Sequence, residues 1–546
     1  MLKNKRVLLL RFLLVFFPCI EGASRLNEYI HHYEALDYDP VEVHERHMRV
    51  KRWTEVSQAE GSEEPSVHLA FSAHQRKFEL RLKRDTSVFS NRLTVEGDNG
   101  PLQEPIDTSH VYAGHLEGVA DSHVFGSIQN GVFDGKIITP VGTYYVERAH
   151  KYTLPSTNAS LHSVIYADHD VHDPYEPMRT GHAKGCGITE DVMEWMQSIQ
   201  NSAEENLPEL NHPKSKPLRK EGITAEKLTS NFHDFQLPDL DHTHDHAYAK
   251  YYKEANSQPP PNSFLSNLNR TLTNHNSYTI ENNSRKRRAF KSGPPKTTCH
   301  LSIQTDPLLW KHIQDQIRTD DETKVREEIL SLIAQHVKAV NHIYSNTLFQ
   351  GKEQYKNIRF EVQRIKIDTD KACRADHRGE KNLFCIENID VSNFLNLHSL
   401  SDHEAFCLAY VFTYRDFTGG TLGLAWVASA SGASGGVCEK YKTYTETIAG
   451  VYQSTKRSLN TGIITFVNYN SRVPPKVSQL TLAHEIGHNF GSPHDYPSKC
   501  RPGGSDGNYI MFASATSGDR PNNSKFSDCS VKNISSVLDA IIHDTK

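Results

Sequence analysis

The sequence predicts an α/β protein in which a domain with a mixed sheet and a histidine-bearing helix follows a β-rich domain and a disordered linker. Three features of the 546 residues lead to this prediction: short strand-like runs early in the chain, a polar stretch in the middle, and alternating strand and helix patterns in the last part. A chain of this length is too long for one ordinary domain, so two or three folded units are expected.

Residues 1–23 have the pattern of a signal peptide. A basic start is followed by the apolar run VLLLRFLLVFF, and the small residues Gly22 and Ala23 offer a cleavage point. Arg11 interrupts the run, which is short for a bilayer-spanning helix, so a membrane anchor is the less favoured alternative. No later stretch approaches the roughly 18 apolar residues of a spanning helix. We therefore expect a protein of the secretory pathway that, as given, would be secreted.

The segment 24–200 is expected to form a β-rich domain, because runs such as VHLAFSA and HVFGSIQNGVFDGKII alternate with turn residues. Polar residues, proline and histidine then dominate 201–288, and such a composition cannot bury enough apolar surface to fold. This segment is therefore predicted to be a disordered linker. Its tract from Asp241 to His246 could bind a metal ion, but no rigid backbone would organise these histidines, which favours a solvated linker.

The linker ends in four consecutive cations, which repel one another and stay exposed. On a secretory protein this run predicts cleavage by a furin-type convertase after the last of them, rather than a generic basic patch, because it lies where a linker meets a folded segment. The four residues are Arg285, Lys286, Arg287 and Arg288. The run from Arg81 to Arg84 is a weaker match, since it continues a strand-like pattern.

The segment 289–546 alternates strand and helix patterns, which predicts a domain with a mixed sheet. CHLSIQTD, IRFEVQRIKI, CLAYVFT, GTLGLAWVA and TGIITFVN are expected to be strands, and VSQLTLAHEIGHNF is expected to be a helix. A further helix is expected at about 322–346, because its apolar residues recur at helical spacing. These apolar residues are Val325, Ile329, Ile333, Val337 and Val340.

The formal net charge of -5 is small for this length, so nothing in the composition supplies the basic surface that nucleic-acid binding needs. In a secretory protein, cysteines favour disulfides over redox catalysis. Five sequons also fit the secretory pathway, although each alone is a weak signal. Glycosylation is accordingly expected at Asn158, Asn269, Asn282, Asn522 and Asn533.

The most informative motif has the form HExxHxxGxxH and spans 484–494. His484 and His488 are four residues apart, so on a helix they share one face and could bind a single ion. Gly491 can adopt the positive φ that ends the helix and turns the chain, which would return His494 to the same ion. Three histidines leave a position for water, the pattern of a catalytic zinc site rather than a closed structural one.

Glu485 lies beside a ligand but points away from the ligand face. It is therefore placed to hold the water that Zn²⁺ would acidify, to take its proton, and to pass that proton to the leaving amine of a cleaved peptide. A zinc site without catalysis is the alternative, but such a site would not need this glutamate and would more often use cysteines. The sequence thus predicts a zinc-dependent peptidase.

Two classes of HExxH protein differ in the source of the third metal ligand. One takes a glutamate from a separate helix, which the nearby His494 argues against. The other, the metzincin pattern, requires a methionine after the third histidine, and Met511 in GNYIMF fits it. The sulfur of Met511 would pack beneath the imidazoles without binding the metal, unless this methionine is an unrelated core residue.

At this point the chain resembles the ADAM metalloproteases, and within them the Kuzbanian-type, α-secretase subgroup. The resemblance covers nearly the whole chain apart from the linker, and Asp495 directly after the third histidine is the ADAM form of the motif. It is carried by LNEYIHHYEALDYD (26–39), GLAWVASASGASGGVCEK (423–440), NTGIITFVNYNSRVPPKVSQ (460–479), TLAHEIGHNFGSPHD (481–495) and GNYIMFASATSGD (507–519).

The resemblance implies a cell-surface enzyme that sheds membrane-protein ectodomains, including Notch-like and amyloid-precursor-like substrates. It also implies an edge strand that binds substrate by strand addition beside the zinc. The residues matching this strand are Leu422, Gly423, Leu424, Ala425, Trp426 and Val427.

The resemblance further implies a propeptide that inhibits the enzyme. Cys186, in KGCGI, matches the cysteine switch, in which a thiolate occupies the fourth zinc position and displaces the catalytic water. A free buried cysteine is the alternative, and inhibition could rest more on other propeptide contacts.

The resemblance suggests disulfides between Cys299 and Cys407 and between Cys500 and Cys529. Two further cysteines, Cys373 and Cys385, are twelve residues apart in one expected loop and plausibly pair with each other. Cys438 then remains as a free thiol, and we expect its natural partner just past Lys546.

The family continues with disintegrin, cysteine-rich and transmembrane regions, which this chain lacks, so it is expected to be a fragment or a short soluble isoform. Two rival hypotheses remain besides an active shedding protease. One is an adhesion or decoy module with an idle protease domain, which the intact Glu485 disfavours. The other is a zymogen fragment that never reaches a membrane substrate.

Overall fold

The computed structural model describes residues 25–56, 65–103, 106–152, 161–178, 185–203, 297–374, 382–429, 435–448, 451–514 and 518–543. The expected signal peptide, the basic run 285–288, nearly all of the expected linker, and Asn158, Asn269 and Asn282 lie outside these residues. None of the helices in the described part of the chain combines the length and apolar character needed to span a bilayer.

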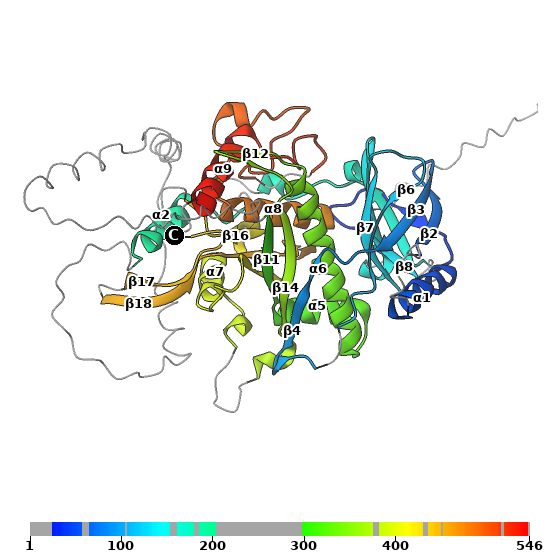
Figure 1. Cartoon of the computed structure of the whole chain (residues 1–546), viewed down its shortest axis with the longest axis horizontal. Helices are drawn as coiled ribbons and strands as arrows, with labels where there is room; N and C mark the ends of the chain where they lie inside the picture. The colour runs from blue at the N-terminus through cyan, green and yellow to red at the C-terminus, as the bar shows by residue number, and fades with distance from the viewer. Residues whose placement is uncertain are drawn as a thin grey trace, which may run out of the picture.

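A curved eight-stranded antiparallel sheet forms the N-terminal part of the molecule (Figure 1). In β2, every second residue is buried, as expected for a strand with one face on a core. Helix α1 (Pro40–Val56) packs on this sheet. In spatial order the strands are β1 (Glu34–Leu36), β10 (Ser163–Ala167), β9 (Gly142–Arg148), β8 (Val132–Thr139), β7 (His123–Gln129), β6 (Val111–Leu116), β3 (Arg76–Arg84) and β2 (Val67–Ala73).

A second, seven-stranded mixed sheet forms the core of the rest of the molecule. Its central strands are parallel, and β16 is antiparallel to its neighbour β19. In spatial order the strands are β16 (Gly423–Ala425), β19 (Thr461–Thr465), β15 (Leu408–Thr413), β11 (Thr298–Thr305), β14 (Arg359–Ile367), β4 (Phe89–Gly97) and β5 (Gly100–Pro101).

Helices cover this sheet, and α8 runs beside β16 and β19 (Figure 1). Most helices begin with a side chain that caps the first backbone N–H groups, as Asp306 does at α5 and Asp390 at α7. The helices are α2 (Glu190–Asn201), α5 (Pro307–Ile317), α6 (Glu322–Ser345), α7 (Val391–Ser399), α8 (Pro475–Asn489) and α9 (Asp528–His543). Short two-stranded ladders join β12 (Phe349–Gln350) to β13 (Gln354–Tyr355), β17 (Tyr441–Ile448) to β18 (Val451–Ser458), and β20 (Val467–Asn468) to β21 (Ser471–Arg472).

The predicted fold class is confirmed: a β-rich part precedes an α/β domain with a mixed sheet. The five expected strands correspond to β11, β14, β15, β16 and β19, and the expected helices are α6 and α8. All five apolar residues that predicted α6 are buried. The run 81–84 lies inside β3, which is hydrogen-bonded on both sides, so it is not an exposed loop.

Two strands of the seven-stranded sheet, β4 and its neighbour β5, come from the N-terminal part of the sequence. β4 lies in the N-terminal part of the sequence, before the expected linker, yet it pairs in parallel with β14 and extends the α/β sheet (Figure 1). The N-terminal part is therefore built into the C-terminal sheet as well as packed against it. Strand pairing of this kind between distant segments is invisible to periodicity, which reports only which face of a strand is buried.

The structure contains the three expected disulfides, Cys299–Cys407, Cys373–Cys385 and Cys500–Cys529. Cys438 is a free thiol at an exposed turn, as expected, and Cys186 is free and buried.

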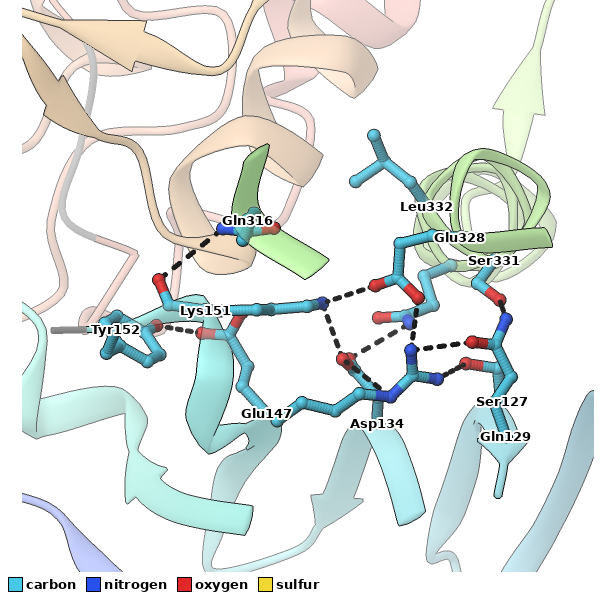
Figure 2. Close-up of polar contacts among 12 residues, drawn as sticks. Ser127, Gln129, Asp134, Glu147, Lys151, Tyr152, Gln316, Glu328, Ser331 and Leu332 are labelled. Atoms are coloured by element: carbon cyan, nitrogen blue, oxygen red, sulfur yellow. Dashed lines mark hydrogen bonds and ion pairs between the residues drawn. The ribbon is translucent and has the colours of Figure 1, made fainter. Parts of the chain in front are cut away.

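A buried cluster of ionic side chains joins the two parts (Figure 2). Lys151 binds Asp134 at 2.5 Å and Glu328 of α6 at 3.3 Å, and Arg148 pairs with the same glutamate. Burial alone would raise the pKa of Asp134, but Lys151 and Arg148 lower it to about 2. Each side chain of the cluster is less than a tenth exposed. Two cations are thus balanced by two carboxylates, one of which comes from the other part of the molecule.

Replacing Glu328 by glutamine should destabilise the chain strongly, because it leaves two buried cations with one carboxylate. The expected loss in the free energy of unfolding is about 3–5 kcal/mol, measured by urea denaturation of the full chain. Glu327→Gln is the matched control, because the neighbouring side chain is only half-buried and lies outside the cluster. Equal stability of the two variants would show that the ion cluster does not hold the two parts together.

Candidate metal centre

Helix α8 presents His484 and His488 on one face, one turn apart. Each ring is oriented by a backbone carbonyl: Nδ1 of His484 lies 2.6 Å from the oxygen of Ile510, and Nδ1 of His488 lies 2.7 Å from that of Ser492. A carbonyl oxygen only accepts, so each Nδ1 carries the proton and each Nε2 presents a lone pair. The two Nε2 atoms face each other at 3.0 Å.

Gly491 turns the chain after α8 so that a third imidazole reaches the same point. Its φ of +94° is left-handed, and a Cβ there would lie 2.3 Å from a methyl group of Val537. The ring of His494 then lies 5.3 Å from that of His484 and 4.9 Å from that of His488, measured between centroids. The three histidines are all buried.

This arrangement fits a metal ion. Two buried lone pairs that face each other at hydrogen-bonding distance repel unless a proton or a cation lies between them. Burial lowers the pKa of His484 to about 4 and lowers the pKa of His488 well below its ordinary value, which favours neutral rings. Ligand atoms of Cys186 and the three histidines all lie within 4.8 Å of one another. Neutral imidazoles and a thiol are the donors that Zn²⁺ prefers.

Glu485 is fully buried next to these rings. Burial raises the pKa of Glu485 to about 8, and its Oε1 has no hydrogen-bond partner among the described residues. A Cβ on Gly423 of β16 would lie 2.7 Å from that Oε1. The strand beside α8 therefore needs a glycine at this position, which leaves space for the carboxylate.

Below the helix, Met511 packs against the glycine between the two histidines. A Cβ on Gly487 would lie 2.4 Å from its sulfur, and Met511 is fully buried. Met511 thus lies against the turn of α8 that carries the two histidines. The same segment orients the site, because Ile510 accepts from His484 and Met511 accepts from the N–H of Asp495 at 2.8 Å.

Sequence reasoning did not assign a role to several groups that fix the site. Asp495 accepts hydrogen bonds from Ser527 at 2.5 Å and Ser530 at 2.8 Å, which ties the start of α9 to the third histidine. Asn489 donates to the carbonyl of Trp426 at 2.9 Å and accepts from Tyr410 at 2.6 Å, which ties the end of α8 to the sheet. An apolar pattern does not reveal such buried polar anchors.

Cys186 is the fourth group at the centre. Its sulfur lies 3.5 Å from Nε2 of His488 and 4.0 Å from a carboxylate oxygen of Glu485. Burial and the neighbouring Glu485 raise the pKa of the thiol. The expected proximity of this cysteine to the three histidines is therefore present.

The backbone around Cys186 occupies the edge of the seven-stranded sheet. Leu422 donates to the carbonyl of Gly185 at 2.7 Å, and Gly187 donates to that of Gly423 at 2.8 Å. Cys186 pairs with Gly423 in parallel, and Gly185 also bridges Ser514 on the other side. The segment 185–187 thus lies in a groove between the edge strand and the chain after Met511.

The expected edge strand is shorter than predicted. β16 comprises only Gly423–Ala425, although Leu422 and Trp426 still exchange backbone hydrogen bonds with β19. After this segment, α2 covers the continuation of the edge: Trp195 packs on Trp426 with ring centroids 5.0 Å apart, and Gln200 donates to the carbonyl of Val427 at 2.9 Å. All six expected edge residues are buried beneath these contacts.

A small cavity opens beside Cys186 and Glu485. Apolar side chains of α8 and of the segment after it line it, together with Thr481 and Ser514. The apolar lining residues are Val477, Leu480, Ile510 and Phe512.

Two of the expected glycosylation sites lie within the described residues. The amide of Asn522 donates to the carbonyl of Gly507 at 3.1 Å, and Asn533 lies half-buried in α9.

Comparison with known proteins places this geometry among metallopeptidases. Residues 324–540 match the Metallo-peptidase family M12B, Reprolysin-like. The chain is 39% identical over 545 residues to the human and bovine disintegrin and metalloproteinase domain-containing protein 10, covering 98% of this chain and 60% of each relative. The Caenorhabditis elegans homolog is 40% identical over 97% of this chain and 51% of its own length. The chain thus spans little more than half the length of these curated relatives.

Gly491→Ala should weaken both the fold and metal binding, because the added methyl group collides with Val537 and displaces the turn that brings His494 to the site. We expect a loss of about 1–3 kcal/mol in the free energy of unfolding and a lower affinity for zinc, measured by urea denaturation and by competition with a chelator.

Gly504→Ala is the matched control, since Gly504 has a similar positive φ of +62° but nothing within 4 Å of its Cβ position. It should cost roughly 1 kcal/mol and leave zinc affinity unchanged. If both variants bound zinc as the parent does, the turn would not be what completes the site.

Proposed function

The chain belongs to the ADAM family of reprolysin-like metallopeptidases, and from this premise we propose that it is a zinc-dependent endopeptidase made as a latent precursor. The observation that carries the proposal is the position of two nitrogen atoms. Nε2 of His484 and Nε2 of His488 face each other at 3.0 Å beside the buried Glu485. With His494 they form a three-histidine ligand set, which leaves one position for a water molecule or an inhibitory ligand.

When bound, Zn²⁺ would supply Lewis acidity to the scissile carbonyl and lower the pKa of a water molecule. Glu485 would hold this water, accept its proton and return the proton to the leaving amine. Gly423 would keep the space that the carboxylate needs. The backbone of residues 422–427 would bind an extended substrate by strand addition, and the cavity lined by Val477 and Leu480 would receive an apolar side chain.

Latency would come from the segment 185–187 and from α2. Cys186 would provide the fourth ligand in place of water, and its neighbours occupy the backbone groups that a substrate strand needs. Their parallel pairing with β16 and the cover provided by α2 support this proposal. The ion cluster around Glu328 and the pairing of β4 with β14 would retain the propeptide in place.

Activation would require a furin-type convertase to cut after Arg288, which would free the propeptide to leave the groove. The propeptide would comprise residues 24–200, followed by the linker 201–288 and the catalytic domain 289–546. Three disulfides support passage through an oxidising secretory compartment.

We further propose that the substrates are ectodomains of membrane proteins at the cell surface, with Notch-like and amyloid-precursor-like proteins as the leading class. This proposal rests on family membership and on the similarity to disintegrin and metalloproteinase domain-containing protein 10. A buried Glu485 in an intact ligand environment favours an active enzyme over an idle adhesion module.

Glu485→Gln should retain zinc but abolish peptidase activity, because glutamine is nearly isosteric yet cannot accept a proton from water. We expect activity to fall at least ~100-fold. Zinc content and turnover of a quenched peptide would be measured on the processed protein. Glu404→Gln, at an exposed position, is the control and should remain fully active. Residual activity above about 1% with normal zinc content would refute the role of Glu485.

Replacing all four residues Arg285, Lys286, Arg287 and Arg288 by alanine should yield a full-length, latent protein, because the convertase site is removed while the propeptide contacts remain. Immunoblots of secreted protein and a peptide-cleavage assay would check this expectation. Mature-sized protein from the variant would place the processing site elsewhere.

A further inference from the structure

A second cluster of metal-binding side chains lies in the N-terminal sheet, away from the three-histidine centre. It comprises His32, Glu34 and His74, whose ligand atoms all lie within 4.8 Å of one another. Nε2 of His32 is 3.8 Å from Oε1 of Glu34, and Nδ1 of His74 is 3.9 Å from the same oxygen. We propose that this cluster binds a Zn²⁺ ion.

The distances fit an ion between the groups better than direct contacts among them. An imidazolium–carboxylate hydrogen bond would bring the two atoms to about 2.8 Å, roughly an ångström closer than they lie. Two ligands on one zinc ion, each about 2.0–2.1 Å from it in tetrahedral geometry, lie roughly 3.3 Å apart. Each of the two distances to Oε1 of Glu34 would therefore have to shorten by about half an ångström on zinc binding.

The carboxylate is already oriented. Oε2 of Glu34 accepts the backbone N–H of His74 at 2.8 Å, which leaves Oε1 directed at both rings. Metal sites depend on such secondary hydrogen bonds to hold their ligands. The side chain of His74 is only 12% exposed, and its buried Nε2 has no hydrogen-bond partner in the part of the chain that the structure describes.

The surroundings favour a cation. Asp168 and Asp170 flank His169, each 3.7 Å from one of its ring nitrogens, and Asp170 also acts electrostatically on His74. His32 and Glu34 are partly exposed, so an ion could enter from solvent.

The backbone at His74 is unusual in a way that the site would explain. His74 and Gln75 form the two-residue turn between β2 and β3, with φ of +48° and +58°. Such turns strongly prefer asparagine and glycine, which tolerate the left-handed conformation. A histidine here costs stability and places its ring at the cluster.

The cluster spans the closure of the N-terminal sheet. β1 and β2 are the two edge strands of the eight-stranded order, and they contact each other, although no ladder joins them among the described residues. His32 and Glu34 lie at the β1 edge, and His74 lies at the end of β2. A zinc ion would therefore link the edges of β1 and β2, which no backbone ladder joins among the described residues.

The experiment counts zinc per chain by plasma mass spectrometry after equilibration at saturating buffered free zinc. All proteins carry His242→Asn, His244→Asn and His246→Asn, which removes the histidine tract as a competing binder. His74→Asn is the main variant, because asparagine tolerates the left-handed turn and should preserve the fold. Glu34→Gln is the second, because its amide oxygen can still accept the N–H of His74. His68→Asn removes a histidine 3.4 Å from Glu117 and is the matched control.

We expect His74→Asn and Glu34→Gln each to bind one zinc fewer than the parent, and His68→Asn to bind as many as the parent. Zinc should also raise the melting temperature of the parent more than that of His74→Asn. This difference between proteins does not depend on whether the three-histidine centre is occupied, so it is independent of the proposed peptidase function. Equal zinc content in parent and His74→Asn would overturn the proposal and leave an imidazole–carboxylate contact only.

Discussion

The structure depends most on the close approach of two buried imidazole nitrogens, Nε2 of His484 and Nε2 of His488, which lie 3.0 Å apart with their lone pairs facing each other. Such an arrangement is unfavourable without a cation, so the surrounding chain must hold it in place. The carbonyls of Ile510 and Ser492 fix the ring tautomers, and the turn at Gly491 adds the third ring. The segment around Met511 supports the helix from below, and Asp495 ties the site to α9 through two serine hydroxyls. Each of these features has a physical reason once the ion is included.

The N-terminal part contacts the rest of the molecule at several places besides the three-histidine centre. It supplies β4 to the α/β sheet, three of the four side chains of the buried ion cluster, the segment 185–187 on the edge strand, and α2 over the rest of that edge. These contacts involve separate elements of the C-terminal part, namely β14, α6 and β16. The proposed latency would thus depend on several contacts of the N-terminal part, of which Cys186 is the one at the metal site.

Much of the site could be predicted from sequence because its chemistry is local. The spacing of His484, His488 and His494 around Gly491 encodes helix, turn and ligands within eleven residues. The strands and the helix at 322–345 were also predictable, since burial imposes a period that a single segment displays. Met511 was predicted from its place after the third histidine in the metzincin pattern, whereas Cys186 required family resemblance, because nothing in its own neighbourhood indicates a metal.

Features that join distant segments could not be predicted in this way. Tertiary packing produces the pairing of β4 with β14 and the contact of Glu328 with Arg148 and Lys151. In the sequence, each of these residues looks like an ordinary surface or strand residue. The same holds for His32, Glu34 and His74, whose proximity depends on the closure of the N-terminal sheet. Asn489 and Asp495 are polar anchors whose partners lie far away in sequence or after a turn.

The central claim is that the three histidines and Cys186 together bind one zinc ion in the latent chain. X-ray absorption at the zinc edge tests it most directly, on the full chain carrying His74→Asn and loaded with one equivalent of zinc. We expect three nitrogen ligands at about 2.0–2.1 Å and one sulfur at about 2.3 Å, with the sulfur lost in a Cys186→Ser version of the same protein. A spectrum with nitrogen and oxygen ligands alone, or a sulfur that persists after Cys186→Ser, would contradict it.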